Sequence, residues 1–190
     1  MVFPIGSFAL GVMDTMSDID LVIVAPPRVT REQDFFGELV TLLKNNTSQV
    51  TEILSLDKAY VPIIKLKYNG WPVDIQFANY SNIEDLGCFQ EFPQHIEDSK
   101  SLLAINSILI VQRIKSLVSF KKFQILLRMV KLWATRRGIR SNTCGYLGGI
   151  SWSIMVAQTC ISFPNFEVNM LFTMFFTLFD LWKWPQPVIL

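Results

Sequence analysis

Two aspartates, Asp18 and Asp20, have the spacing in this chain that points most directly to chemistry. The segment from Asp18 to Val24 has the composition of a buried strand, and a strand places both carboxylates on one face because alternate side chains point the same way. A third aspartate, Asp74, lies on the polar side of a second strand-like segment whose other side is apolar. If the two strands are neighbours, the three carboxylates converge.

Three converging carboxylates repel one another unless a cation neutralises them, and magnesium prefers oxygen ligands, water and substrate phosphates. Two such ions about 4 Å apart can clamp the attacking and leaving oxygens of an in-line displacement. Upstream, a Gly6-Ser7 turn after a strand could direct backbone N–H groups and a hydroxyl at phosphate. Taken alone, the aspartate pair also fits solvated aspartates at a strand's start, and the turn also fits an ordinary loop.

The elements that must position these residues change character along the chain. In the first part of the chain, hydrophobic periodicity predicts a helix over 34–44 and strands over 18–24 and 50–56. Segments 61–68 and 71–78 flank Asn69-Gly70, the preferred dipeptide of a two-residue hairpin turn. From about residue 99 the pattern is helical, with helices expected over 101–117, 121–137, 150–160 and 168–182. We therefore expect an α+β domain over 1–98 and part of a helical domain over 99–190.

Composition limits the classes of function. The net charge is +1, so no global field attracts nucleic acid, and a charged fraction of 17% against 51% hydrophobic residues predicts apolar surface that another segment or partner covers. The most apolar tract, over 168–179, is shorter than the roughly 20 residues of a membrane span, so we expect no membrane partner. The three cysteines are far apart and favour a reducing setting, and His95 is expected in a loop.

Several segments resemble eukaryotic nuclear poly(A) polymerases, in the same order along nearly the whole chain. They read GSFALGVMDTMSDIDLVIVAP, AYVPIIKLKYNGWPVDIQFA, LLRMVKLWATRRGIRSN, GYLGGISWSIMVAQTC and FPNFEVNMLFTMFFTLFDLWKWPQPVIL. The resemblance implies a palm of the DNA polymerase β type, a mixed sheet with flanking helices, followed by part of an all-helical central domain. It also implies truncation at both ends, without the C-terminal RNA-binding domain.

The resemblance further implies a reaction and a set of site residues. The 3′-hydroxyl of RNA attacks the α-phosphate of ATP, and three aspartates hold two magnesium or manganese ions. Carried over residue by residue, the triad is Asp18, Asp20 and Asp74. The expected nucleotide contacts are Phe3 or Phe8 at the base, Gly6 and Ser7 at the triphosphate, Asn106 at the ribose or base, Lys131 at the triphosphate, and Gly149 with Ile150 at adenine.

The chain also departs from the family pattern. Arg140 replaces a tyrosine, and although it cannot stack as a phenol does, its forked donors could bind phosphate. Ser107 and Leu109 replace the glycine and the arginine that follow the family's asparagine. A basic cluster could bind RNA or could be a solvated helix face: Lys121, Lys122, Arg128, Arg136, Arg137 and Arg140.

Three functions follow as hypotheses. The first is template-independent transfer of AMP from ATP to RNA in the nucleus, with the RNA 3′ end and the 3′-end processing machinery as partners. The second is a catalytically weak remnant that binds a nucleotide or a protein. The third is a uridylyl- or CCA-adding enzyme, against which the segment from Gly145 to Trp152 argues.

Overall fold

The computed structural model describes residues 1–15, 17–81, 96, 98–140 and 144–190. The described chain forms two compact units, Met1–Val111 and Gln112–Leu190, and the boundary falls inside a helix. The domain boundary expected between residues 98 and 99 stays a prediction. His95 and Cys88 lie outside the described residues, and Cys144 and Cys160 are free thiols.

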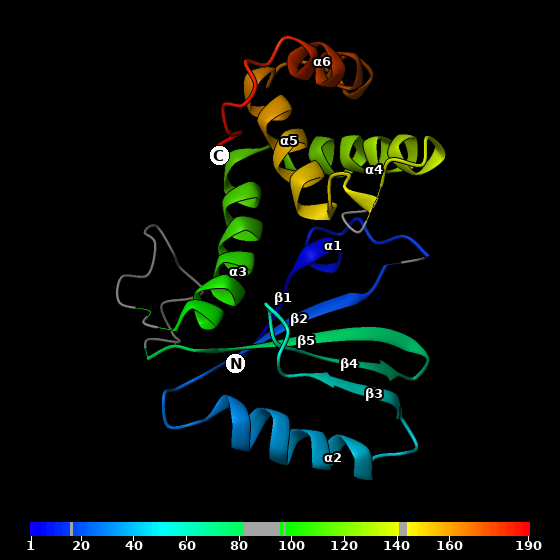
Figure 1. Cartoon of the computed structure of the whole chain (residues 1–190). Coiled ribbons are helices and arrows are strands. Elements are labelled where there is room, and N and C mark those ends of the chain that lie inside the picture. Colours follow the sequence, from blue (N-terminus) through cyan, green and yellow to red (C-terminus); the bar gives the residue numbers. More distant parts are fainter. Residues whose placement is uncertain (16, 82–95, 97, 141–143) are drawn as a thin grey trace. The chain divides into compact units, whose positions relative to one another are not determined.

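The first unit is a mixed five-stranded sheet with helices on both faces (Figure 1). Its strands lie in the order β1-β2-β5-β4-β3, and only the β2–β5 pair is parallel. The elements are β1 (Val2–Pro4), α1 (Gly6–Ala9), β2 (Ile19–Ala25), the π-type helix η1 (Arg31–Leu39), α2 (Val40–Asn45), β3 (Val50–Leu56), β4 (Ile63–Tyr68), β5 (Trp71–Asn79) and the start of α3 (Ser99–Leu117). This confirms the predicted α+β class.

The turn between β4 and β5 sets the register in which these two strands pair. Asn69 and Gly70 both have positive φ, at 48° and 83°, which is the backbone of a type I′ turn. Tyr68 therefore pairs with Trp71, and the remaining pairs follow in step. The predicted hairpin is confirmed, and so is the strand over 50–56.

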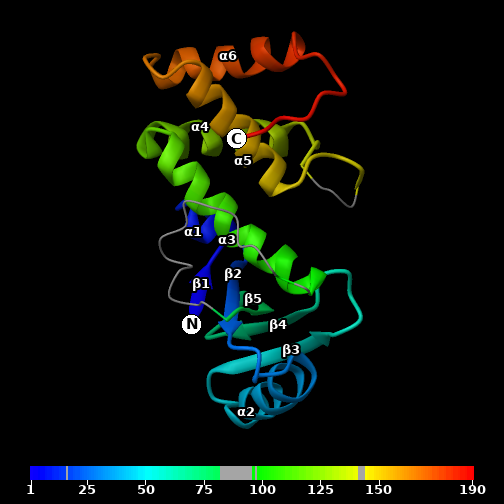
Figure 2. The ribbon, with the colours of Figure 1, turned by 90° about the vertical axis from the view of Figure 1, so that its left-hand side faces the viewer.

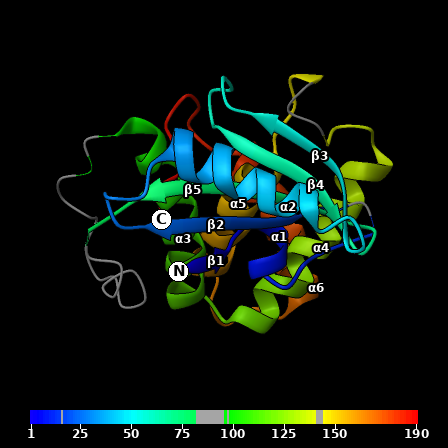
Figure 3. The same ribbon diagram turned by 90° about the horizontal axis from the view of Figure 1, so that it is seen from below.

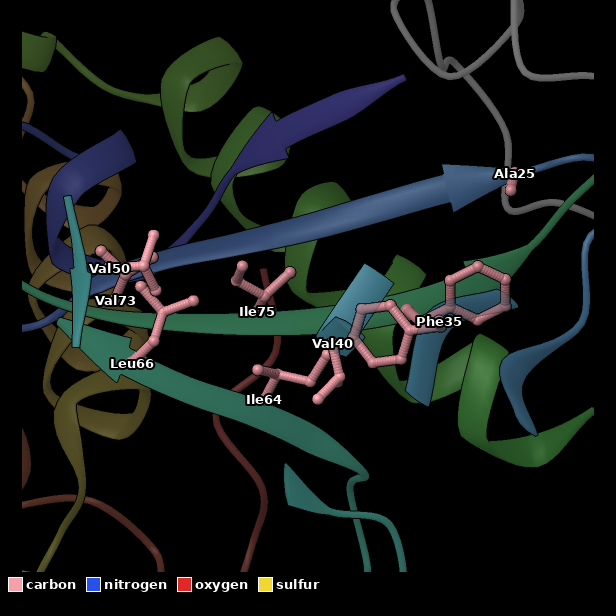
Figure 4. Packing of buried hydrophobic residues seen from close by; sticks show 9 residues of the cluster. Ala25, Phe35, Val40, Val50, Ile64, Leu66, Val73 and Ile75 are labelled. Atoms are coloured by element: carbon pink, nitrogen blue, oxygen red, sulfur yellow. The ribbon is translucent and has the colours of Figure 1, made fainter. Parts of the chain in front are cut away.

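Two apolar clusters cover the two faces of the sheet. On one face, η1 and α2 press Phe35 and Val40 against Ile64, Ile75 and their neighbours (Figure 4). Figure 3 shows α2 lying across that face. On the other face, the beginning of α3 packs Ile105 and Ile108 against β2. Because Asp20 and Asp74 alternate with residues of the first cluster, both belong to the α3 face.

The helix expected over 34–44 begins earlier, at Arg31, and continues as α2 to Asn45. Thr30 accepts a hydrogen bond from the Gln33 amide, while the Asp34 carboxylate accepts from the Thr30 amide and hydroxyl. This reciprocal capping, rather than the first periodic apolar residue, sets the start of the helix.

The second unit packs three helices around an aromatic core: α4 (Phe120–Arg136), α5 (Gly149–Ser162) and α6 (Val168–Asp180) (Figure 2). The apolar stripe of α4 is fully buried and consists of Phe123, Leu126, Leu127, Val130 and Ala134. Trp133 meets Phe176 edge-on at 4.7 Å between ring centroids, and Trp152 packs beside Phe175. The helix α6 ends two residues before the expected Trp182.

Membrane spans were sought among the described helices. None is by itself both long enough and apolar enough to cross a bilayer. The helices α3 and α4 meet those limits only when they are counted together as a bent pair.

Candidate active site

The parallel pairing of β2 with β5 places Asp20 directly opposite Asp74. Both lie near the amino ends of their strands, on the α3 face, and Asp18 precedes β2 by one residue. Farther along the same face, Val22 and Ala78 are buried under α3. The carboxylates therefore lie beside a buried apolar cluster that holds their strands in place.

The three carboxyl groups influence one another electrostatically. Burial, followed by the charges of Asp74 and Asp18, raises the pKa of Asp20 to about 6, while Lys65 opposes the shift. A proton or a cation at this place would relieve the repulsion. The side chain of Asp74 is 13% exposed, and its Oδ2 accepts a hydrogen bond from the Lys65 ammonium.

The backbone of Gly6 packs directly on the Asp20 carboxylate. The Ile5 amide donates to the Asp20 carbonyl at 2.9 Å, and the chain then turns at Gly6, where φ is +59°. A Cβ atom on Gly6 would lie 2.4 Å from Asp20 Oδ2, so only glycine fits. The expected turn is a one-turn helix, α1, because the Ala9 and Leu10 amides bond back to Ile5 and Gly6.

A short hydrogen-bonded loop leads into Asp18. The Ser17 hydroxyl donates to Asp14 Oδ1 at 2.9 Å and accepts from the Asp14 amide at 3.0 Å. Ser17 is buried and directly precedes Asp18. These contacts restrict the backbone from which the first carboxylate projects.

The remaining predicted contacts of the first unit lie on β1, α1 and α3. Phe3 is half-buried, pairs with Val22 across β1 and β2, and packs against the apolar cluster under α3. Phe8 is 45% exposed on α1. The Oδ1 atom of Asn106 is buried and has no hydrogen-bond partner among the described residues. Such an atom fits a residue that awaits a ligand donor.

Lys131 and Arg140 are joined through Thr135 in the second unit. Lys131 is 7% exposed on α4, and its carbonyl accepts from the Thr135 hydroxyl at 2.8 Å. Arg140 Nη1 donates to the same hydroxyl at 3.1 Å. Gly149 and Ile150 open the first turn of α5, and both are exposed. The side chain of Arg140, which follows α4, is thus held against the last turn of the helix that carries Lys131.

The donor set was tested for its fit to a divalent cation. Among the residues that the structure describes, no three His, Cys, Asp or Glu side chains form a ready-made metal centre. Asp18, Asp20 and Asp74 nevertheless offer only hard oxygen ligands, and the raised pKa of Asp20 reflects burial and then the charges of Asp74 and Asp18, which a cation would offset. The residues therefore fit a hard divalent cation.

Two features of the site were not expected from the sequence. One is Lys65, which contacts Asp74 across the β4–β5 hairpin. The other is a buried polar cluster beside the end of β5, in which Arg31 donates to Asp98 and Ser101. The hairpin register could have revealed Lys65, because a two-residue turn at Asn69-Gly70 pairs it with Asp74.

Two matches to protein families cover most of the chain. Residues 1–84 match the poly(A) polymerase nucleotidyltransferase domain, and residues 122–190 match the poly(A) polymerase central domain. The poly(A) polymerase of Dictyostelium discoideum is 37% identical over 196 residues, which are all of this chain and 24% of that protein. Nuclear poly(A) polymerase 4 of Arabidopsis thaliana is 36% identical over 194 residues, again all of this chain and 26% of that protein.

Solved structures share the fold. The polymerase core of TRAMP, an RNA surveillance complex, has a TM-score of 0.61 at 20% identity, covering 96% of this chain and 53% of that one. The Cid1 poly(U) polymerase has a TM-score of 0.55 at 23% identity, covering 82% and 42%. These likenesses confirm the predicted fold, a mixed five-stranded sheet with flanking helices followed by a helical region.

The chain spans about a quarter of the length of the relatives it matches. Both family matches are domains of the same kind of enzyme, they occur in chain order, and the relatives align from the first residue to the last. The chain therefore belongs to the poly(A) polymerase family.

Proposed function

We propose that this chain carries a nucleotidyl-transfer site that moves AMP from ATP to the 3′-hydroxyl of RNA. The observation that carries the proposal is the register of β2 and β5, which sets Asp20 against Asp74 with Gly6 packed on Asp20. A strand pair that presents carboxylates beside a glycine-serine turn is suited to metal-assisted phosphoryl chemistry.

The roles of the residues follow from their chemistry. Asp18, Asp20 and Asp74 would hold two magnesium or manganese ions, which when bound would supply positive charge to the attacking oxygen, the leaving oxygen and the triphosphate. The backbone N–H groups of the Gly6-Ser7 turn would donate to triphosphate oxygens, because the first amides of a helix have no acceptor within it.

Residues of the helices would orient the nucleotide. Asn106 would use its unpartnered Oδ1 to accept from the ribose or base. Lys131 and Arg140 would bind phosphate oxygens, the lysine as a point charge and the arginine as a fork. Gly149 with Ile150 would contact adenine, and Phe3 or Phe8 would line the base pocket. Each of these roles is part of the proposal.

We further propose the nucleus as the site of action and the RNA 3′ end and the processing machinery as partners. Relatives from Arabidopsis thaliana carry the name nuclear poly(A) polymerase. A near-neutral chain has no global attraction for RNA, so we expect weak RNA affinity.

The experiment is extension of an oligo(A) primer with ATP and either Mg²⁺ or Mn²⁺. We expect extension by the wild type, loss of at least a hundredfold in rate for Asp20→Asn and Asp74→Asn, and wild-type activity for Asp57→Asn, an exposed carboxylate on the loop after β3. Extension that survives at Asp20→Asn and Asp74→Asn would refute the assignment.

A second function, nucleotide or partner binding without turnover, is favoured by Arg140, which stands where the family has a tyrosine and is held by Thr135. The same assay separates the two proposals. ATP binding without extension of the primer would support the binding function, and extension with UTP in preference to ATP would indicate a uridylyl donor.

A further inference from the structure

Lys65 completes a row of charged residues that crosses three neighbouring strands. Asp20 on β2 pairs with Asp74 on β5, and Asp74 pairs in turn with Lys65 on β4. On β4 the alternate residues Ile64 and Leu66 are buried in the opposite apolar cluster. Lys65 therefore projects from the same face as the two aspartates.

The contact between Lys65 and Asp74 is an ion pair of unequal burial. The Asp74 side chain is 13% exposed and the Lys65 side chain 42%, and the ammonium contacts Asp74 Oδ2. A largely buried carboxylate beside another carboxylate is unfavourable without a counter-charge.

A second lysine on the same strand provides a comparison. Lys67 has the same 42% exposure and projects from the same face, but it pairs at 2.7 Å with Glu52, which is 64% exposed. An ion pair between two solvated groups contributes little to stability. The two lysines thus differ chiefly in the carboxylate that they face.

We propose that Lys65 is the counter-ion of the metal-free site, and that a divalent ion must displace its ammonium from Asp74 in order to bind. This inference rests on the proposed function, because it assumes that Asp74 is a metal ligand. Lys65 then acts through Asp74 as a positioning residue. It keeps the carboxylates together when no ion is present, and it competes with the ion for the same oxygen.

The competition has two measurable consequences. An ammonium and a divalent ion at one carboxylate repel each other, so removal of the ammonium should tighten metal binding. Without the ammonium, the metal-free carboxylates lose their neutralising charge, so the metal-free protein should be less stable. Bound metal should restore that stability because it supplies the missing charge.

The test compares Lys65→Met, Lys65→Arg and the matched control Lys67→Met in the full chain. Mn²⁺ is titrated by calorimetry, and the thermal midpoint is measured in chelator and in saturating Mn²⁺. Lys65→Met should bind Mn²⁺ roughly tenfold more tightly, a change of about 1.4 kcal/mol. Its midpoint should fall in chelator and return to the wild-type value in Mn²⁺. Lys65→Arg, which keeps the charge, should behave as wild type, and so should Lys67→Met.

Unchanged or weaker Mn²⁺ binding by Lys65→Met would overturn the proposal. A fall in the thermal midpoint that is equal in chelator and in Mn²⁺ would also overturn it. If Lys65→Met does not fold in chelator, folding on addition of Mn²⁺ supports the proposal. If it folds in neither condition, Lys65→Gln takes its place. Wild-type Mn²⁺ binding that is unaffected by Asp20→Asn would instead refute the proposed function, and the role of Lys65 with it.

Discussion

Asp20 is the residue at which the charges of the candidate site act together. Burial and two neighbouring carboxylates raise its pKa to about 6, and the backbone of Gly6 lies against its side chain. In the metal-free protein, ionisation of Asp20 is therefore less favourable than that of an ordinary aspartate, and the carboxylate takes up a proton as the pH falls through about 6. A bound cation would relieve this repulsion, so the repulsion favours cation binding.

Replacing Gly6 with alanine tests how tightly the turn is packed on that carboxylate. A Cβ atom would meet Asp20 Oδ2 at 2.4 Å, and a φ of +59° is itself unfavourable for alanine. We expect Gly6→Ala to lose about 1–2 kcal/mol of unfolding free energy from the backbone alone, and more from the contact. We also expect weaker Mn²⁺ binding, measured by calorimetry.

Gly70→Ala is the control, because Gly70 has a φ of +83° but no atom within 4 Å of the Cβ position. It should lose unfolding free energy in urea titrations and keep its Mn²⁺ affinity. Wild-type affinity in Gly6→Ala would show that the turn does not constrain Asp20.

Site residues could be predicted where their positions depend on neighbouring residues in the sequence, and not where they depend on distant ones. Strand alternation correctly predicted the face of Asp74. The strand expected from Asp18 begins one residue later, at Ile19, but the charge of Asp18 still acts on Asp20. Lys65 was missed although the hairpin register implies it. Asp98 was missed because its role depends on Arg31, which is 67 residues away in the sequence.

At the scale of elements, a partly buried polar cluster joins η1, β5 and α3. Asp98 accepts from the amides of Lys100 and Ser101 at the start of α3 and from the Arg31 guanidinium. The Ser101 hydroxyl is fully buried and accepts from the Asn79 amide at the end of β5. The cluster therefore fixes α3 above the face that carries the carboxylates.

The pH dependence of stability should report this cluster. Burial alone would raise the pKa of Asp98, but hydrogen bonds from Arg31 and Ser101 outweigh it and lower the pKa to about 2. Because the folded-state value lies below the ordinary 3.8, ionised Asp98 stabilises the fold above about pH 4, and this contribution is lost as the pH falls towards 2. Asp98 is 39% exposed, so solvent screening limits the effect to about 1 kcal/mol.

The measurement is the difference in unfolding free energy between wild type and Asp98→Asn, from urea titrations between pH 6 and pH 2.5. The difference should be constant above pH 5 and shrink below pH 4. With Asp57→Asn, on an exposed loop, it should stay near zero. A difference for Asp98→Asn that does not change with pH would contradict this account of the cluster.

Element boundaries followed from the sequence where capping or turn chemistry is local. The β4–β5 hairpin has its predicted place because Asn69-Gly70 determines it, and β3 spans the predicted residues. The predicted start of η1 was wrong because the helix is capped by Thr30 and Asp34, which lie four residues apart in the sequence. The parallel pairing of β2 with β5 joins segments about fifty residues apart, which local periodicity does not encode.

At the scale of the whole molecule, the low charged fraction corresponds to exposed apolar side chains on the second unit. Leu132 is 59% exposed and lies in an apolar groove of about 500 Å³. The groove is lined by Met129, Leu132, Trp133, Arg136, Arg137 and Phe172. Exposed apolar surface of this kind promotes self-association.

We expect Leu132→Lys to raise the protein concentration at which light scattering begins, with a change in unfolding free energy below about 0.5 kcal/mol. Leu127→Ala, on the buried face of the same helix, should instead cost about 2–5 kcal/mol. Equal effects of the two substitutions on stability would contradict the burial pattern of α4.

The central claim is that the carboxylates on β2 and β5 form one site for divalent ions. Its most direct test is the number of Mn²⁺ ions bound per chain in the presence of a non-hydrolysable ATP analogue, measured by calorimetry. The account predicts about two ions for the wild type and for Asp57→Asn, and a loss of tight binding in both Asp20→Asn and Asp74→Asn. Unchanged stoichiometry and affinity in both of these variants would contradict it.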